Sequence, residues 1–162
     1  DSQRLEMVSR LAIATGSRGM AGGQALDLAS EGQVLDLVQL ENIHIHKTGA
    51  LIRACAHLAL GCAPETPSAD ARRLIHFAEY IGLAFQIRDD ILDVEGETVV
   101  LGKTGGKDAD QGKATYPGLL GLAAARHKAQ SVVEQAISEL ATMDERADPL
   151  RWIARYIVDR NY

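Results

Sequence analysis

Three carboxylates fall within a single turn of one stretch of the chain, from Gln86 to Asp93, which reads Q-I-R-D-D-I-L-D. If this stretch is a helix, Asp89 and Asp93 share a face, and Gln86 lies one turn earlier on the same side. The neighbouring residues are apolar, which indicates a mostly buried helix, and carboxylates are costly to bury unless they are paired or bound to a metal. All-oxygen ligands suit a hard cation such as Mg²⁺, which also binds waters and phosphate oxygens. Such a motif alone is more often a solvent-exposed acidic stripe, but the apolar neighbours argue against that interpretation, so the choice between the stripe and a metal site depends on the rest of the chain.

A lysine and a threonine precede a glycine in the middle of a second helical pattern, which reads H-K-T-G-A-L. A Thr-Gly pair inside a helix suggests a kink, and a kink frees backbone carbonyls to face a ligand. Lys47 beside such a kink would suit a phosphate, although an exposed lysine on a slightly bent helix is the simpler interpretation of these residues alone. His44 and His46 lie two positions apart and cannot share a helix face, which argues against a histidine metal pair.

The elements that must position these groups form an all-α pattern. Aromatic residues make up only 4% of the chain, alanine and leucine are abundant, and there is almost no alternation of β-branched and polar residues. We expect five or six helices, at approximately residues 5–30, 37–61, 70–94, 117–143 and 148–159. Proline at the first turn marks the start of the last two.

Glycines interrupt the first expected helix at Gly16, Gly19, Gly22 and Gly23. Each glycine in a helix interior costs up to about 1 kcal/mol of helix stability. Four glycines within eight residues therefore indicate close packing against a neighbouring helix or a ligand. Gln24 and Asp27 follow at a spacing of three, which puts an amide and a carboxylate on one face. Such a pair by itself is more often a local hydrogen bond than a site.

Residues 95–115 are rich in glycine and charge, and we expect them to form a long loop rather than a regular element. Long loops inside a compact domain are usually functional or disordered. This one begins a few residues after the carboxylates, so Lys103 and Lys113 could reach whatever a metal there holds.

Composition limits the remaining possibilities. The chain of 162 residues is long enough for one domain with a real core. A net charge of -5 without a basic patch argues against a nucleic-acid partner. There is no signal peptide and no apolar run of transmembrane length, so we expect a cytoplasmic protein without a membrane anchor. A helical pattern is already running by Leu5, which suggests the later part of a longer protein.

The two cysteines, Cys55 and Cys62, lie seven residues apart on one expected helix. That spacing puts them about 10 Å apart along the helix axis, which is too far for a disulfide. No other residues complete a metal-binding set around them. We expect both to be small core residues in a reducing compartment.

Five motifs together resemble the trans-prenyl diphosphate synthases, and among these the bacterial farnesyl diphosphate synthases. The motifs keep the family's order and spacing over nearly the whole chain, and they are G-M-x-G-G-Q-A-L-D-L (Gly19 to Leu28), H-K-T-G-A-L-I (His46 to Ile52), G-L-A-F-Q-I-R-D-D-I-L-D (Gly82 to Asp93), L-G-K (Leu101 to Lys103) and G-K-A-T-Y-P (Gly112 to Pro117). The family also has a first aspartate-rich motif and N-terminal helices, which this chain lacks. The resemblance thus implies that residues 1–162 form the C-terminal part, half or somewhat more, of a single domain with the isoprenoid-synthase helical-bundle fold.

The resemblance also implies a reaction. Members condense an allylic diphosphate, such as dimethylallyl or geranyl diphosphate, with isopentenyl diphosphate in the presence of Mg²⁺, and they usually act as homodimers. Asp89 would be the main metal ligand of this half, with Asp90 and Asp93 supporting it through water and hydrogen bonds. The allylic diphosphate would be held by three positive charges, Lys47, Lys103 and Lys113. The developing cation would be faced by three oxygen-bearing groups, the Thr48 hydroxyl, the Lys47 carbonyl and the Gln86 amide. The diphosphate clamp would be supported by Gln24 and Asp27.

Several alternatives stay open. Farnesyl diphosphate is the expected product on overall resemblance. Geranyl and geranylgeranyl diphosphate remain alternatives, because the residues that limit product length in the family precede its first aspartate-rich motif, which this chain lacks. A terpene cyclase would carry a different second motif, N-D-x-x-[ST]-x-x-x-E. A non-catalytic subunit of a heteromeric synthase would be expected to lose the lysines or aspartates, and neither is lost here. With one metal motif of two, a polypeptide of these 162 residues alone is expected to be inactive.

Overall fold

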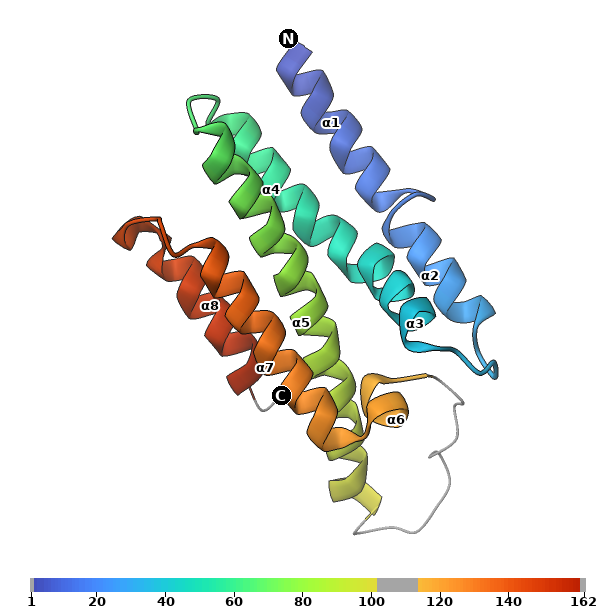
Figure 1. Ribbon diagram of the computed structural model, residues 1–162. Helices are drawn as coiled ribbons and strands as arrows, with labels where there is room; N and C mark the ends of the chain where they lie inside the picture. Colours follow the sequence, from blue (N-terminus) through green and yellow to red (C-terminus); the bar gives the residue numbers. More distant parts are fainter. Residues whose placement is uncertain (1, 102–113, 161–162) are drawn as a thin grey trace.

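A computed structural model describes the backbone of residues 2–101 and 114–160 and the side chains of residues 2–96 and 114–160. Within these ranges the regular elements are helices, as predicted (Figure 1). In chain order they are α1 (Ser2–Thr15), α2 (Met20–Ala29), α3 (Leu37–His44), a π-helical turn η1 (Ile45–Gly49), α4 (Ala50–Cys62), α5 (Ser68–Leu101), α6 (Tyr116–Leu120), α7 (Leu122–Glu139), a 3₁₀ turn η2 (Glu145–Ala147) and α8 (Asp148–Asp159).

Helix α5 is the centre of the bundle. It lies between α4 and the pair α7 and α8, and α1 packs on the far side of α4 (Figure 1). Ala84, Ile87 and Ile91 of α5 are completely buried, because they face the apolar residues of α7. The prediction that the helix carrying the three aspartates is mostly buried is therefore confirmed.

The single helix predicted over residues 5–30, interrupted by glycines, is two helices in the structure, because the chain breaks between α1 and α2. The break falls at Gly16 to Gly19. One of the glycines has the predicted packing role: a Cβ on Gly23 would lie 2.2 Å from the backbone nitrogen of Lys47. Only a residue without a side chain allows α2 to approach the η1 turn this closely.

The second predicted helix does contain an irregular turn at the H-K-T-G motif. Residues Ile45 to Gly49 form a π-helical turn between α3 and α4. An ideal Cβ on Gly82 would lie 3.0 Å from the Cα of Gly49, so α5 also comes very close to this turn. π-helical turns inside helices are frequently found at functional sites.

Two other expected boundaries differ from the structure. The helix predicted over residues 117–143 is two helices, α6 and α7, which separate at Gly121 with a φ of 82°. Residues 95–101, predicted as the beginning of a loop, instead continue α5. The last helix has the predicted bounds, Asp148–Asp159. Lys103 and Lys113 lie outside the described residues.

Both cysteines were predicted to lie in the core, and this is wrong: Cys55 and Cys62 are exposed. The described helices leave their face of α4 uncovered, so the apolar pattern around them does not face the core. Among the described helices, none is long and apolar enough to span a membrane.

Candidate active site

The η1 turn brings the predicted lysine against the predicted aspartate of α2. The Lys47 ammonium donates to the Asp27 carboxylate at 2.7 Å, with 33% of the Lys47 side chain and 17% of the Asp27 side chain exposed. The close contact at Gly23 allows this pairing, since it sets α2 directly on the η1 turn. Gln24 lies on the same helix but is exposed.

The next residue of the turn reaches α5. The Thr48 hydroxyl donates to the side-chain oxygen of Gln86 at 3.0 Å, and the amide nitrogen of Gln86 donates to Asp90 at 3.1 Å. Thr48 and Gln86 were both predicted to face a developing cation, and the structure places them in contact. Both are partly buried.

Asp90 is buried, with 5% of its surface exposed. One of its oxygens accepts from Gln86, and the other accepts from the backbone N–H of Tyr116 at 3.0 Å. The His44 Nε2 atom lies 3.7 Å from the second oxygen, and the His44 ring stacks on Tyr116 with 5.7 Å between the ring centroids. Asp90 thus ties α5 to the beginning of α6 and to the end of α3.

Tyr116 is completely buried, and its hydroxyl has no hydrogen-bond partner among the described residues. Burial, together with the negative charges of Glu41 and Asp90, raises the pKa of this phenol well above its ordinary value. The side chain therefore stays neutral and serves as a packing surface for His44. Neither ring nitrogen of His44 has a hydrogen-bond partner among the described residues.

Asp89 is the more accessible of the adjacent aspartates, with 35% of its side chain exposed. Its carboxylate forms an ion pair with Arg160, whose guanidinium also lies over the Phe85 ring, 4.3 Å from the centroid. The Arg160 carbonyl accepts from Arg88 at 3.1 Å. The chain after α8 is thereby fixed beside the predicted metal motif.

The donor set fits a magnesium ion only in part. The partly exposed Asp89 and the exposed Asp93 lie one turn apart on one face of α5, which matches the one or two carboxylates that Mg²⁺ usually takes from protein. Asp90 faces the other way, and its oxygens already accept two hydrogen bonds. No group of three or more His, Cys, Asp or Glu side chains among the described residues is arranged to hold a metal by itself.

Sequence reasoning missed His44, Tyr116 and Arg160 as neighbours of the motif. His44 was considered only as half of a metal pair with His46. Arg160 lies 71 positions from Asp89, and nothing in its local sequence indicates that it pairs with the motif. Only the packing of α3, α6 and α8 around α5 brings these residues together.

An apolar groove runs along α4 and begins at Ile52, four residues after Thr48. Ile52 and Cys55 lie four and seven positions further along the helix, so they share its face with Thr48. The groove has a volume of about 540 Å³ and is lined mainly by apolar side chains of α4, α5 and α8, among them Ile52, Ala59, Phe77, Ile81 and Ile153. It would suit the hydrocarbon part of a ligand whose polar end lies near Thr48 and Gln86.

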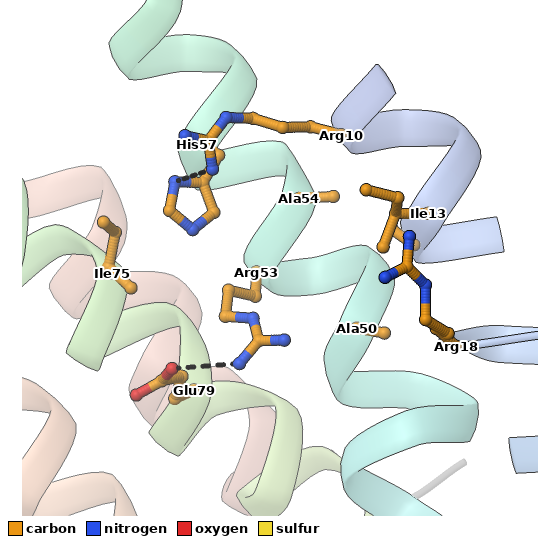
Figure 2. A pocket seen from close by; sticks show the side chains of 10 residues that line it. Arg10, Ile13, Arg18, Ala50, Arg53, Ala54, His57, Ile75 and Glu79 are labelled. Carbon is orange, nitrogen blue, oxygen red and sulfur yellow. Dashed lines mark hydrogen bonds and ion pairs between the residues drawn. The ribbon is translucent and has the colours of Figure 1, made fainter. Parts of the chain in front are cut away.

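A second cavity, on the opposite side of α4, is lined by both charged and apolar side chains. This arginine basin comprises Arg10, Arg18, Arg53, His57 and Glu79 and has a volume of about 260 Å³. Figure 2 shows Arg10 reaching His57, with 3.3 Å between the Arg10 Nη1 and His57 Nδ1 atoms, and Arg53 reaching Glu79 at 3.4 Å. Burial, followed by the charges of Arg10 and Arg53, lowers the pKa of His57.

Comparison with known proteins identifies relatives over almost the whole chain. Farnesyl diphosphate synthase of Escherichia coli K12 is 48% identical over 164 aligned residues, which cover 99% of this chain and 55% of that protein. The apo structure of an FPP/GFPP synthase from Zymomonas mobilis is 42% identical, with a TM-score of 0.81, over 96% of this chain and 51% of that one. The chain spans about half the length of the curated relatives that it matches.

A third relative was solved with ligands. The geranyltransferase of Helicobacter pylori complexed with magnesium and isoprenyl diphosphate is 30% identical, with a TM-score of 0.77, over 98% of this chain and 52% of that one. The family model described as polyprenyl synthetase matches residues 3–151. The chain therefore belongs to the polyprenyl synthetase family.

Proposed function

We propose that this chain supplies the second aspartate-rich half of a trans-prenyltransferase, which condenses an allylic diphosphate with isopentenyl diphosphate. The observation that carries this proposal is the meeting of two pairs at the η1 turn. At one side of the turn, the ion pair of Lys47 with Asp27 provides a positive charge. At the other side, the hydrogen bond between Thr48 and Gln86 provides oriented dipoles. A diphosphate leaving group requires the positive charge, and a developing carbocation requires the dipoles.

Each described residue has a chemical task in this proposal. Lys47 binds diphosphate oxygens, and Asp27 holds its ammonium in place at 2.7 Å. The Thr48 hydroxyl and the Gln86 amide present oxygen atoms to the allylic carbon as positive charge develops there. The apolar groove along α4 accepts the hydrocarbon part of the substrate. Lys103 and Lys113 remain predicted diphosphate ligands outside the described residues.

Magnesium is proposed as the cofactor, held in this half by Asp89 with Asp93. When bound, it would neutralise diphosphate charge and polarise the bond to the leaving group. Asp90 remains a predicted member of the motif, and its hydrogen bonds suit the supporting role that the family resemblance implies. The Helicobacter pylori relative, solved with magnesium and isoprenyl diphosphate, supports this assignment.

Farnesyl diphosphate is the proposed product, since the Escherichia coli relative carries that name at 48% identity. Geranylgeranyl and geranyl diphosphate stay as alternatives, and the FPP/GFPP synthase of Zymomonas mobilis illustrates that the product varies among relatives.

A homodimer and a cytoplasmic location also remain proposals. Exposed apolar side chains on α1 and α2, including Leu5, Val8, Leu11 and Leu28, support an association with further protein surface.

The proposal is tested by Asp89→Ala in the protein at its full natural length. Stability should fall by less than the catalytic loss, because the substitution removes the ion pair with Arg160 but relieves repulsion between carboxylates along α5. Loss of transition-state charge stabilisation typically costs about 3 to 4 kcal/mol, or hundreds-fold in rate. The measurement is the steady-state rate with dimethylallyl and isopentenyl diphosphates, and activity within a few-fold of wild type would contradict the metal assignment. Asp159→Ala, an exposed aspartate at the end of α8, is the matched control.

A further inference from the structure

We infer that Asp90 is a positioning residue, and that it decides which end of the Gln86 amide faces the reacting centre. This inference rests on the proposed prenyl transfer, since it assigns a task to a side chain behind the proposed site. The amide of Gln86 has an oxygen at one end and an NH₂ group at the other, and the two ends interact oppositely with a carbocation. The structure contains a fixed chain of hydrogen bonds that selects between them.

The chain begins at a backbone group that cannot turn. The Tyr116 N–H donates to one oxygen of Asp90 at 3.0 Å, at the first residue of α6. A carboxylate only accepts hydrogen bonds, so its second oxygen needs another donor. The amide nitrogen of Gln86 supplies that donor at 3.1 Å. The Gln86 oxygen must then point the other way, where it accepts from Thr48 at 3.0 Å.

Burial removes the alternatives. Only 5% of the Asp90 surface is exposed, so bulk water cannot replace Gln86 as the second donor. On the remaining side lie His44, whose Nε2 atom is 3.7 Å from Asp90, and the Tyr116 ring stacked on it. The aspartate is therefore held from three elements, α3, α5 and α6, and has one open direction, towards Gln86.

The orientation matters for charge. With the oxygen of Gln86 towards Thr48, the negative end of the amide dipole lies on the side of the proposed cation, where it lowers the energy of developing positive charge. With the amide reversed, the NH₂ group would lie there and oppose the same charge. The Thr48 hydroxyl would not prevent the reversal, because a hydroxyl can rotate to accept instead of donate.

Asp90→Asn should cause this reversal. The Tyr116 N–H is part of the backbone, so it keeps the oxygen of the substituted side chain and leaves the new NH₂ group facing Gln86. Two NH₂ groups cannot hydrogen-bond to each other, so Gln86 must turn its oxygen inward. The substitution keeps size and shape, and removes only the acceptor that held the amide in place.

We expect Asp90→Asn to lower kcat by tenfold or more, on the order of the loss of one oriented dipole, with little change in the KM of either diphosphate. The Mg²⁺ concentration for half-maximal rate should also stay constant. Asp89→Asn is the matched comparison, being the same substitution one residue earlier, and it should raise the Mg²⁺ requirement. If Asp90→Asn instead raised the Mg²⁺ requirement like Asp89→Asn, Asp90 would be a metal ligand and the inference would be wrong.

A second substitution should restore the site. In the double variant Asp90→Asn with Gln86→Glu, the introduced NH₂ group meets one oxygen of the introduced carboxylate, whose other oxygen faces Thr48 again. The net charge of the pair is unchanged. We expect the double variant to recover most of the lost kcat, whereas Gln86→Glu alone places two carboxylates together and should be the worse single variant. A double variant no better than Asp90→Asn would overturn the inference.

The wild-type protein offers a test that does not depend on a variant folding. The Gln86 side-chain amide and the Tyr116 backbone amide donate to the same carboxylate, so a nuclear Overhauser effect should connect their protons. Contacts from the Gln86 amide protons to Thr48 in place of Tyr116 would show the reversed orientation and sink the inference. Absence of prenyl transfer by the wild-type protein would sink the proposed function instead, while the amide orientation would still be measured.

Discussion

The polar residues around Asp90 and those of the arginine basin form two clusters at different positions along the α3–η1–α4 segment, and they are built differently. Asp90 is 5% exposed and accepts its hydrogen bonds from a backbone N–H and a partly buried amide. In the basin the Arg10 side chain is 43% exposed and the Arg53 side chain 46% exposed, and their partners are carboxylates and an imidazole at the surface.

This difference decides what each cluster can do. Around Asp90 burial keeps bulk water from replacing a missing donor, so each hydrogen bond constrains the next. In the basin a guanidinium can exchange one partner for water or for another carboxylate at little cost. The buried cluster is therefore suited to orienting a reacting group, and the exposed one to binding α1, α4 and α5 together loosely.

The largest effect that separates the two clusters should come from Tyr116→Ala. Truncating this completely buried ring should destabilise the protein by about 3 to 5 kcal/mol, the range for buried aromatic residues. Tyr116→Phe is the control, since the hydroxyl has no partner among the described residues, and its removal should change stability by less than about 1 kcal/mol. Urea denaturation followed by circular dichroism measures both. Equal losses for the two variants would mean that the hydroxyl, and not the ring, supports the cluster.

The sequence was sufficient to predict the parts of the site that lie along single helices. The spacing of Asp89 and Asp93, the burial of α5 and the irregular turn beside Lys47 all follow from local patterns, and the structure contains these three features. The family resemblance implied that Thr48 and Gln86 face one reacting centre, and the structure adds that the two side chains are in contact.

The remaining features depend on how helices meet. Asp90 and Asp89 are adjacent and chemically identical in the sequence, and only the register of α6 and α8 against α5 gives one of them Tyr116 and the other Arg160. The cysteines show the same limit, because an apolar helix face looks the same in sequence whether it meets the core or lines a groove. Cys55 lines the apolar groove and is exposed.

A smaller effect is expected in the arginine basin. The coupling between Arg53 and Glu79, at 3.4 Å and nearly half exposed, should be no more than about 0.5 kcal/mol in a double-mutant cycle with Arg53→Gln and Glu79→Gln. It should decline further as salt is raised, because exposed charges are screened. A coupling of about 2 kcal/mol that persists in high salt would show that the basin is as constrained as the cluster around Asp90.

The smallest effect concerns the pH dependence of His57. Its pKa is lowered first by burial and then by the charges of Arg10 and Arg53, with Glu79 and Glu6 acting in the opposite direction. Because the folded state holds fewer protons than the unfolded state, whose histidine pKa is about 6.5, stability should fall as the pH drops below that value and stay level above it. His57→Gln should therefore reduce the loss of stability with falling pH, which urea denaturation midpoints measured between about pH 7.5 and 5.5 would show.

Arg10→Gln should raise the pKa of His57, which an NMR titration would measure. The pKa should still stay below 6.5, because burial is a larger cause of the shift than the arginine charges. A His57 pKa that fell in Arg10→Gln would show that the arginine does not act on the imidazole through its charge.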